Sequence, residues 1–573
     1  MRKNLFILLI FFSAFFSSNE VMGAWKPIKT VISKNEPAAA NPQYLAPYLA
    51  FNQFGYTVAV WGFYDNATSR SYQQAAISLD FGATWEKPTV YIDQVNYQST
   101  PPYYTHPRVA VNDANQAIIA WQKYNGSYYE VKVTPFGTLP QNLQILDANA
   151  GVSGNNHGPR PQVAMVDQHA IVIWSHRDGT NFSTYIATSS DAGRSWNTPV
   201  DIDSTNFSLT STFPKIAYLD STGQNIIAVW QHDSDPIVIN YLCTTKAAIS
   251  TDYGVTWNVT NISGLAAPDW TLPDIDTDGN GNAIVTWQQV DPAGYPGPYN
   301  VDIARYSLSD NSWSSVQTVG NTYDWAYPMI DMNPKGHAAI IWQKNINPLG
   351  WPGPSGPQIS TSLDLGQTWT SPVLIEPATN SEWIMPEVAI NNHDTILTSW
   401  NNSTGADWDI KVGHSTDFGE NWSVNTLVAS IPLAWPPYSP RSKVFISDEG
   451  NHNAVNGIAI WANVNSGTPY GAVEMNHFQE LFLKATGEQH RIRDFLQEEV
   501  QNVITAEAIG QPGTFKLYRD ASLTQLISSI KNHNRVAKFI ENNLKRGETF
   551  TYYVTWTDEF GNVEGPIKIT IEG

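Results

Sequence analysis

The chain has 573 residues, a formal net charge of −20 and 22 tryptophans. This length exceeds one ordinary core, so we expect two or more domains or one large repeat structure. The acidic balance argues against nucleic acid as a partner, because such affinity depends on Lys and Arg neutralising phosphates. The single Cys243 excludes an intramolecular disulfide, and we expect a small buried thiol there.

Residues 1–24 have the pattern of a signal peptide. Arg2 and Lys3 give a positive start, Leu5–Phe16 is an apolar run, and small residues follow near Gly23. No later apolar stretch is long enough to span a bilayer as a helix. We therefore predict an exported protein, secreted or periplasmic, without a transmembrane segment.

From residue 25 onward one pattern recurs: an apolar strand, a turn, and a second apolar strand that ends in Trp. The eight copies lie about 53 to 61 residues apart and end at Trp61, Trp121, Trp174, Trp230, Trp287, Trp342, Trp400 and Trp461. Each first strand has a Pro at or before its start, at Pro47, Pro107, Pro161, Pro214, Pro273, Pro328, Pro386 and Pro440. Pro is tolerated at the first residue of a strand, where no ladder donor is needed. A repeat of this length predicts the four-stranded blades of a β-propeller.

A second motif, Ser-x-Asp-x-Gly-x-Thr-Trp, follows five of the copies, in one of them with Asn in place of Thr. Its aspartates are Asp80, Asp191, Asp252, Asp364 and Asp417. The motif predicts a tight hairpin in which Ser and Asp bind backbone amides, Gly supplies a positive φ, and Trp packs into the blade. We therefore assign these aspartates a structural role.

This motif is the Asp box (BNR repeat), and residues 25–478 resemble the sialidase superfamily of β-propellers. The repeat count predicts eight blades, whereas sialidases have six, so six or seven also remain open. The segment that begins at Trp25 is similar to the fourth strands of other copies. We expect it to complete the last blade and leave no free edge.

Residues 479–573 lack the repeat and have more charged residues. Phe550–Asp558 and the final strand from Val563 resemble the last two strands of a fibronectin type III domain. We therefore predict an all-β chain, a propeller followed by a small β-sandwich that acts as a spacer.

The resemblance to sialidases implies exo-sialidase chemistry. In that family three arginines hold the substrate carboxylate, a Tyr nucleophile is partnered by Glu, and an Asp is the acid. The first arginine belongs to a Phe/Tyr-Arg-Ile-Pro motif. This chain has Ala46-Pro47-Tyr48-Leu49 there, so it departs from the pattern.

Three other arginines flank the Pro that opens an inner strand, at Arg108, Arg160 and Arg441. Arg suits bidentate binding of a carboxylate, but strand-end arginines also pair with loop acids. Glu387 is the one Glu at a comparable position, next to Pro386. No catalytic set emerges from these residues.

Aromatic residues occupy the same strand entrances. Tyr104, Trp270, Trp325 and Trp383 each lie three residues before the strand-opening Pro, and Trp435 lies five before. Such rings stack on sugar faces or anchor protein partners, or else pack the loops against each other.

The string from Asp274 to Asn280 is similar to a calcium-binding loop, but Val285 stands where a bidentate Glu is required. The string falls where every blade has its first hairpin turn, so we favour turn chemistry over a calcium site and predict no metal and no cofactor. The sequence thus favours a module that binds a glycan or a protein surface. The alternative is an exo-sialidase or another glycoside hydrolase with a diverged site.

Overall fold

The computed structural model is all-β in the residues that it describes, and every strand pair is antiparallel. It describes residues 22–25, 30–31, 47–65, 70–86, 90–95, 106–137, 142–152, 158–178, 181–203, 212–233, 242–264, 267–290, 298–349, 353–379, 384–403, 407–432, 442–447, 456–464, 471–493, 498–509, 513–532, 536–542, 544, 548–558 and 563–571. The chain divides into two compact units, one of Trp25–Gln479 and one built on Glu480–Gly573.

Eight sheets make up the larger unit within these ranges, one for each copy of the sequence repeat. The first three sheets, from the inner strand outward, are β3 (Tyr48–Phe51), β4 (Thr57–Asp65), β5 (Arg70–Ser78) and β6 (Val90–Val95); β7 (Arg108–Val111), β8 (Gln116–Tyr124), β9 (Tyr128–Gly137) and β10 (Gln144–Val152); β11 (Gln162–Val166), β12 (His169–Asp178), β13 (Asn181–Ser189) and β14 (Val200–Asp201). The fourth contains β15 (Lys215–Tyr218), β16 (Ile226–Asp233), β17 (Leu242–Ser250) and β18 (Asn258–Asn261), with β19 (Ala267–Pro268) also on β17.

The second half of the unit follows the same order. Its sheets are β20 (Asp274–Thr277), β21 (Asn282–Val290), β22 (Tyr299–Ser307), β23 (Ser312–Trp313) and β24 (Gln317–Thr322); β25 (Met329–Met332), β26 (Ala338–Asn345), β27 (Ser355–Ser362) and β28 (Val373–Leu374); β29 (Glu387–Ile390), β30 (Ile396–Ser403), β31 (Asp407–Ser415) and β32 (Ser423–Pro432); and β33 (Lys443–Ile446), β34 (Asn456–Val464) and the first part of β35 (Gly471–Arg493). β1 (Met22–Trp25) and β2 (Thr30–Val31) pair with β35.

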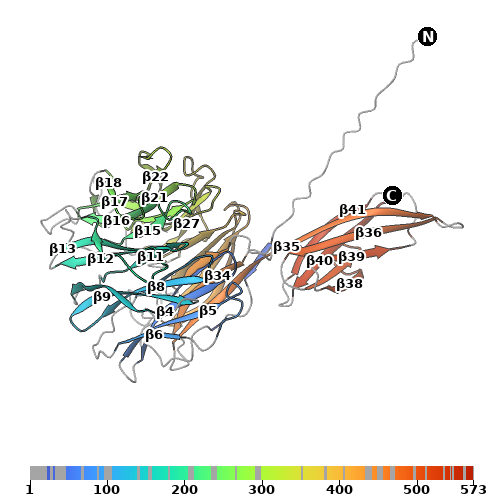
Figure 1. Ribbon diagram of the computed structural model, residues 1–573. Coiled ribbons are helices and arrows are strands. Elements are labelled where there is room, and N and C mark those ends of the chain that lie inside the picture. Colours follow the sequence, from blue (N-terminus) through green and yellow to red (C-terminus); the bar gives the residue numbers. More distant parts are fainter. Residues whose placement is uncertain are drawn as a thin grey trace, which may run out of the picture. The chain divides into compact units, whose positions relative to one another are not determined.

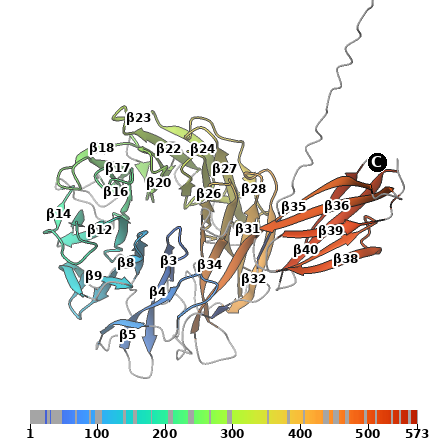
Figure 2. The same cartoon turned by 45° about the vertical axis from the view of Figure 1, so that its right-hand side comes forward.

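The inner strands lie next to one another in chain order around a common centre (Figures 1 and 2). The last and first sheets also meet: Tyr48 of β3 contacts Phe445 of β33 edge to face, with ring centroids 5.5 Å apart. Leu49 and Met475 belong to one buried cluster. This is a β-propeller, as the sequence predicted. The predicted closure by the N-terminal strand is confirmed, since Thr30 of β2 lies opposite Met475 of β35.

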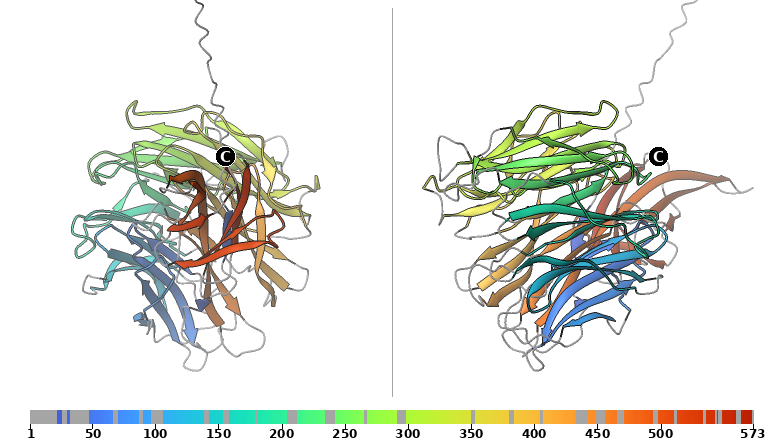
Figure 3. Two further views of the ribbon diagram at one scale, coloured as in Figure 1. Left: turned by 90° about the vertical axis from the view of Figure 1, so that its right-hand side faces the viewer. Right: turned by 60° about the vertical axis from the view of Figure 1, so that its left-hand side comes forward.

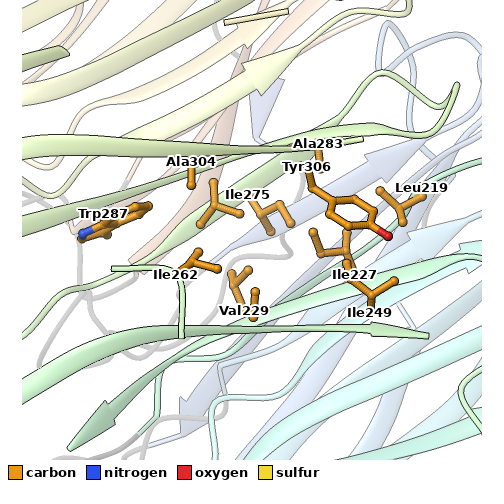
Figure 4. Packing of buried hydrophobic residues seen from close by; sticks show 12 residues of the cluster. Leu219, Ile227, Val229, Ile249, Ile262, Ile275, Ala283, Trp287, Ala304 and Tyr306 are labelled. Atoms are coloured by element: carbon orange, nitrogen blue, oxygen red, sulfur yellow. The ribbon is translucent and has the colours of Figure 1, made fainter. Parts of the chain in front are cut away.

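The core lies between neighbouring sheets. All eight repeat tryptophans are at most 1% exposed. Figure 4 shows one such layer, in which Ile227 and Val229 of the fourth sheet face Ile275 and Trp287 of the fifth. Each large side chain buried here contributes roughly 1.5–3 kcal/mol of hydrophobic stabilisation, so the sheets hold together mainly through these layers. The predicted burial of Cys243 is also observed.

The Asp-box turns have the hydrogen bonds of a stapled hairpin. In the box of β17, Asp252 accepts from the Thr256 N–H (2.8 Å) and hydroxyl (2.6 Å), and the Ser250 hydroxyl accepts from the Gly254 N–H (2.9 Å). Tyr253 and Gly254 both have a positive φ, 64° and 82°. Two consecutive left-handed residues form the tight turn whose twist matches the strands on either side.

A belt of side-chain hydrogen bonds joins the second to seventh sheets, each to the next, at the end where inner strands begin. In each case the side chain of the residue that follows the buried Trp accepts a hydrogen bond. The donor is a backbone N–H one or two residues before the strand-opening Pro of the next sheet. The five pairs are Gln122 with Arg160 (2.8 Å), Ser175 with Thr212 (3.1 Å), Gln231 with Thr271 (2.8 Å), Gln288 with Ala326 (2.7 Å) and Gln343 with Ile384 (2.9 Å). We call this set the amide belt. All five acceptor side chains are buried.

The residue that directly precedes the strand-opening Pro has a left-handed backbone in six sheets. These residues are His106, Arg160, Phe213, Leu272, Tyr327 and Met385, with φ between 40° and 49°. The proline ring disfavours the right-handed helical region at this position. A left-handed residue without Gly costs about 1–2 kcal/mol, which the surrounding structure, including the amide belt, must offset.

The second compact unit, orange to red in Figure 3, contains two sheets. One pairs the later part of β35 with β36 (Glu498–Ile509) and β39 (Val536–Glu541). The other has the order β38 (Leu526–Asn532), β37 (Gly513–Tyr518), β40 (Phe550–Asp558), β41 (Val563–Ile571). Buried residues of both sheets, among them Phe539 and Trp556, form one core. Among the described residues, none belongs to a helix that could cross a membrane.

Replacing Gln288 by Leu should lower the free energy of unfolding of the propeller by about 2–3 kcal/mol. The buried Ala326 N–H would lose its acceptor, and the Trp270 carbonyl would lose the Gln288 amide donor at 2.8 Å. Denaturant unfolding measures the change. Gln367→Leu, at an exposed Asp-box position, is the control and should stay within about 0.5 kcal/mol of wild type; equal losses in both would contradict the role given to the belt.

Candidate functional site

The first residues of the inner strands line a central cavity of about 310 Å³. Each of the eight sheets contributes one such side chain, namely Tyr48, Arg108, Gln162, Lys215, Asp274, Met329, Glu387 and Lys443. Successive side chains of a strand point to opposite faces, so the third residue of a strand faces the same way as the first. Asp276, Asp331, Ala389 and Phe445 at this third position also line the cavity.

Two ion pairs join neighbouring walls of the cavity. The Lys215 ammonium donates to Asp274 at 2.8 Å, and Lys443 contacts Glu387. Burial opposes the charge on both lysines, but the Asp274 carboxylate holds the pKa of Lys215 above its ordinary value. Burial instead lowers the pKa of Lys443 to about 8, and the nearby Arg108 and Lys215 cations act in the same direction.

Arg108 lies against Tyr48, with its guanidinium carbon 4.6 Å from the ring centroid. Its Nε donates to the Gln162 side chain at 3.1 Å, and one terminal nitrogen donates to the Pro107 carbonyl at 2.8 Å. These contacts fix the plane of the guanidinium at the cavity wall. Burial raises the pKa of the Tyr48 phenol, which therefore acts as a hydroxyl donor at neutral pH.

Asp276 and Asp331 form a carboxyl pair that bridges the fifth and sixth sheets. The two side chains are hydrogen-bonded to each other; burial raises the pKa of Asp276 to about 6, and burial together with Asp276 raises the pKa of Asp331 well above its usual range. Each also accepts a backbone N–H from the next sheet, Asp276 from Met332 and Asp331 from Ile390, both at 2.7 Å. Two adjacent carboxyls of this kind share one proton, since two charges cannot both be accommodated without water.

The charges of the cavity wall are segregated by sheet. The cations Arg108, Lys215 and Lys443 come from the second, fourth and eighth sheets, and the acids come from the fifth, sixth and seventh. While the acid pair keeps its shared proton, the three negative charges balance the three positive ones. The wall thus offers hydrogen-bond donors on one side and acceptors on the other, around a centre without net charge.

A row of aromatic rings runs along the strand entrances from the third to the sixth sheet. Arg160 lies 4.5 Å from the Phe213 ring centroid, Phe213 is 5.6 Å from Trp270, and Trp270 is 5.4 Å from Trp325 at an interplanar angle of 31°. Tyr327 contacts Trp325 edge to face at 5.8 Å. We call these five residues the entrance row. All are partly exposed.

Asp269 positions the centre of this row. One of its carboxylate oxygens accepts from the Trp325 indole N–H at 2.8 Å and from the Tyr299 hydroxyl at 2.5 Å, and the other accepts from the Trp270 N–H at 2.7 Å. The polar edges of Trp325 and Tyr299 are thus held by one acid, which fixes the orientation of the Trp325 indole.

The predicted site residues fall into three groups. Arg108 lines the cavity, and Arg160, Trp270 and Trp325 belong to the entrance row. Tyr104, Trp383, Trp435 and Arg441 lie outside the described residues. The rings that are described pack against each other, and this packing accounts for part of their surface.

Sequence reasoning missed Lys215, Lys443 and Asp331 as wall residues. The position directly after the strand-opening Pro would have found Lys215, because it marks the first residue of an inner strand. The Asp274–Asn280 string contains the predicted hairpin turn in its second half only. Asp274 and Asp276 lie in β20 and face the cavity, whereas the turn begins at Asp278, which accepts from the Asn280 and Asn282 N–H groups at 2.8 and 3.0 Å.

No group of three or more His, Cys, Asp or Glu side chains within the described ranges is arranged to hold a metal ion.

Comparisons with known proteins give no family. No family model matches the chain, and no curated protein matches it. Among solved structures, a Dyadobacter fermentans protein of unknown function is 14% identical, with a TM-score of 0.35 over 66% of this chain and 94% of its own. The Fusarium graminearum GH93 α-L-arabinofuranosidase is 16% identical, with a TM-score of 0.33 over 58% and 97%. The polysaccharide lyase Uly1 is 10% identical, with a TM-score of 0.37 over 78% and 92%. At these values the likenesses carry no argument about activity.

Stability should fall as the pH rises through about 6, because the buried Asp276 carboxyl, whose folded pKa is raised to about 6 by burial, then loses its proton while Asp331 keeps one. The Asp276 carboxyl has a pKa of 3.8 in the unfolded chain and of about 6 in the folded protein. Its contribution to stability is therefore fully present below pH 3.8 and is lost as the pH rises through about 6. Between about pH 4 and about pH 7.5 the wild type should lose on the order of 3 kcal/mol relative to Asp276→Asn, which lacks the carboxyl that titrates in this range.

Thermal unfolding across this pH range measures the difference. Asp310→Asn, at an exposed carboxylate in a turn, is the control and should keep the wild-type pH dependence. Parallel curves for wild type and Asp276→Asn would contradict a raised pKa of Asp276 in the folded protein.

Proposed function

We propose that the larger unit is an eight-bladed propeller that binds carbohydrate at the end where its inner strands begin. The cavity would be the deepest part of the site, and the entrance row would form part of its rim. The observation that supports this most directly is that both features lie at the same strand entrances: Trp270 is four residues before Asp274, and Tyr327 is two residues before Met329.

Sugars present hydroxyl groups at their edges and C–H groups on their faces. The carboxylates, amide and cations of the cavity wall match the edges, and half-buried rings such as Trp325 match the faces. The balance of charge in the wall favours a neutral or zwitterionic sugar over a polyanion. A protein surface is the other partner that aromatic anchors would suit.

Under this proposal residues 1–24 are a signal peptide, and residues 479–573 are a fibronectin type III-like spacer. The protein would act as an exported recognition module, outside the cell or in the periplasm.

Replacing Trp325 by Ala should weaken glycan binding roughly tenfold, because one aromatic contact contributes about 0.5–1.5 kcal/mol. An array of neutral, acidic and amino oligosaccharides would identify the ligand, and calorimetry would measure its affinity. Phe54→Ala removes an exposed ring from the turn between β3 and β4, at the opposite end of the sheet, and should bind like wild type.

Binding that survives in both Trp325→Ala and Arg108→Ala would contradict the proposed site. No glycan binding at all would contradict the carbohydrate proposal and favour a protein partner.

A second candidate function is glycoside hydrolysis, because a protonated carboxyl pair and Glu387 line one cavity. Asp331 or Asp276 would donate a proton to the leaving group, and Glu387 would act as base or nucleophile. The raised pKa of Tyr48 makes it a poorer nucleophile than the sialidase resemblance would require.

Under this second proposal, fluorogenic glycosides, a sialoside among them, should be turned over with an acidic optimum. Asp331→Asn and Glu387→Gln should each reduce turnover by at least about 100-fold. Arg108→Ala tests binding of a substrate carboxylate. Turnover that persists in both acid variants would contradict this assignment, and an inactive wild type would exclude hydrolysis of the glycosides tested.

A further inference from the structure

Two lysines line the same cavity in different surroundings. Lys215 and Lys443 both start inner strands, and each contacts a carboxylate of another sheet. Lys215 donates to Asp274 at 2.8 Å, and the second Asp274 oxygen accepts the Ile330 N–H at 3.1 Å, so this acid is fixed between two donors. Such a site keeps an ammonium charged.

Lys443 is less stabilised as a cation. Its amine faces a wall that also contains Arg108 and Lys215, and its side chain is only 17% exposed. Two neighbouring positive charges and partial loss of water both favour the neutral amine. Burial accordingly lowers the pKa of Lys443 to about 8, whereas the pKa of Lys215 is raised. A lysine amine that has lost water and lies near other cations reacts readily with carbonyl carbon, and the Glu387 carboxylate, although it favours the ammonium, is in contact with Lys443 and can carry its proton.

We propose that Lys443 captures small aldehydes and α-keto acids in the cavity as a reversible imine, with Glu387 as the proton carrier. A cavity of about 310 Å³ admits a compound of this size, and the cations Arg108 and Lys215 favour one that bears a carboxylate. This reactivity does not depend on which glycan, if any, binds at the entrance row.

The chemistry balances without a further reactant. The Lys443 ammonium gives one proton to Glu387, and the nitrogen lone pair forms a bond to the carbonyl carbon. The carbonyl π electrons move to oxygen, which takes the proton back from Glu387 and gives a carbinolamine. The nitrogen then loses its second proton, the C–O bond breaks, and hydroxide leaves with that proton as water. The ammonium and the carbonyl compound thus become a protonated imine and water, with no change in charge or oxidation state.

Reductive trapping of the full-length protein tests the proposal. The probe is glyoxylate, an aldehyde that carries a carboxylate, with cyanoborohydride to fix the imine, and peptide mass spectrometry locates the modified lysines. At about pH 7.5, Lys443 should be modified at least about tenfold more than exposed lysines and more than Lys215, because its neutral fraction is far larger. Its labelling rate should rise through about pH 8, whereas that of exposed lysines rises near pH 10.4.

Three variants sharpen the experiment. Lys443→Arg should lose the dominant label, and Lys335→Arg, at a surface lysine with a 48% exposed side chain, should retain it. Glu387→Gln removes the charge that favours the ammonium, so the midpoint of the pH profile should move to lower pH. Labelling spread over exposed lysines without enrichment at Lys443 in the wild type would overturn the proposal, and so would a midpoint near that of an exposed lysine. Both results are read from the wild type and do not require the variants to fold.

Discussion

The amide belt is the interaction on which the alignment of the second to seventh sheets depends. Hydrophobic layers between sheets are strong but not directional, so they hold the sheets together without fixing the height of one sheet against the next. The Gln231, Gln288 and Gln343 side chains supply that direction, because each accepts one particular backbone N–H in the next entrance loop. Since these amides are buried, a slip of one sheet would leave polar groups without partners.

The geometry of the cavity follows from this alignment. A strand-opening Pro, preceded in six sheets by a left-handed residue, sets the direction in which each inner strand leaves its loop. The side chain after that Pro then faces the centre, where the other sheets present their equivalents. Lys215 and Asp274 are far apart in sequence from Lys443 and Glu387, yet all four line one wall. The charged residues of the site therefore come together only because the sheets are arranged in a ring.

The periodic features of the sequence predicted the periodic part of the structure. The Pro and Trp spacing predicted the repeated sheets, and the resemblance of the Trp25 segment to fourth strands predicted its pairing with β35, because both express local strand patterning. Arg108 was found because it flanks such a Pro. The acid pair and Lys443 were missed because their importance comes from neighbours in other sheets, which no local pattern encodes. The mutual packing of Trp270 and Trp325 was left open, since loop conformation decides it.

Successive side chains of an inner strand point in opposite directions, so the same short strand both packs against a neighbouring sheet and lines the cavity. Leu49 and Val109 each follow a wall position in sequence and are buried between sheets, whereas Tyr48 and Arg108 contribute side chains to the wall. A substitution at a wall position thus changes what the cavity recognises while the packing beneath it stays intact. Variation at the eight wall positions, one for each sheet, would sample many binding chemistries, but partners such as Lys215 and Asp274 must change together, because leaving one buried charge unpaired costs stability.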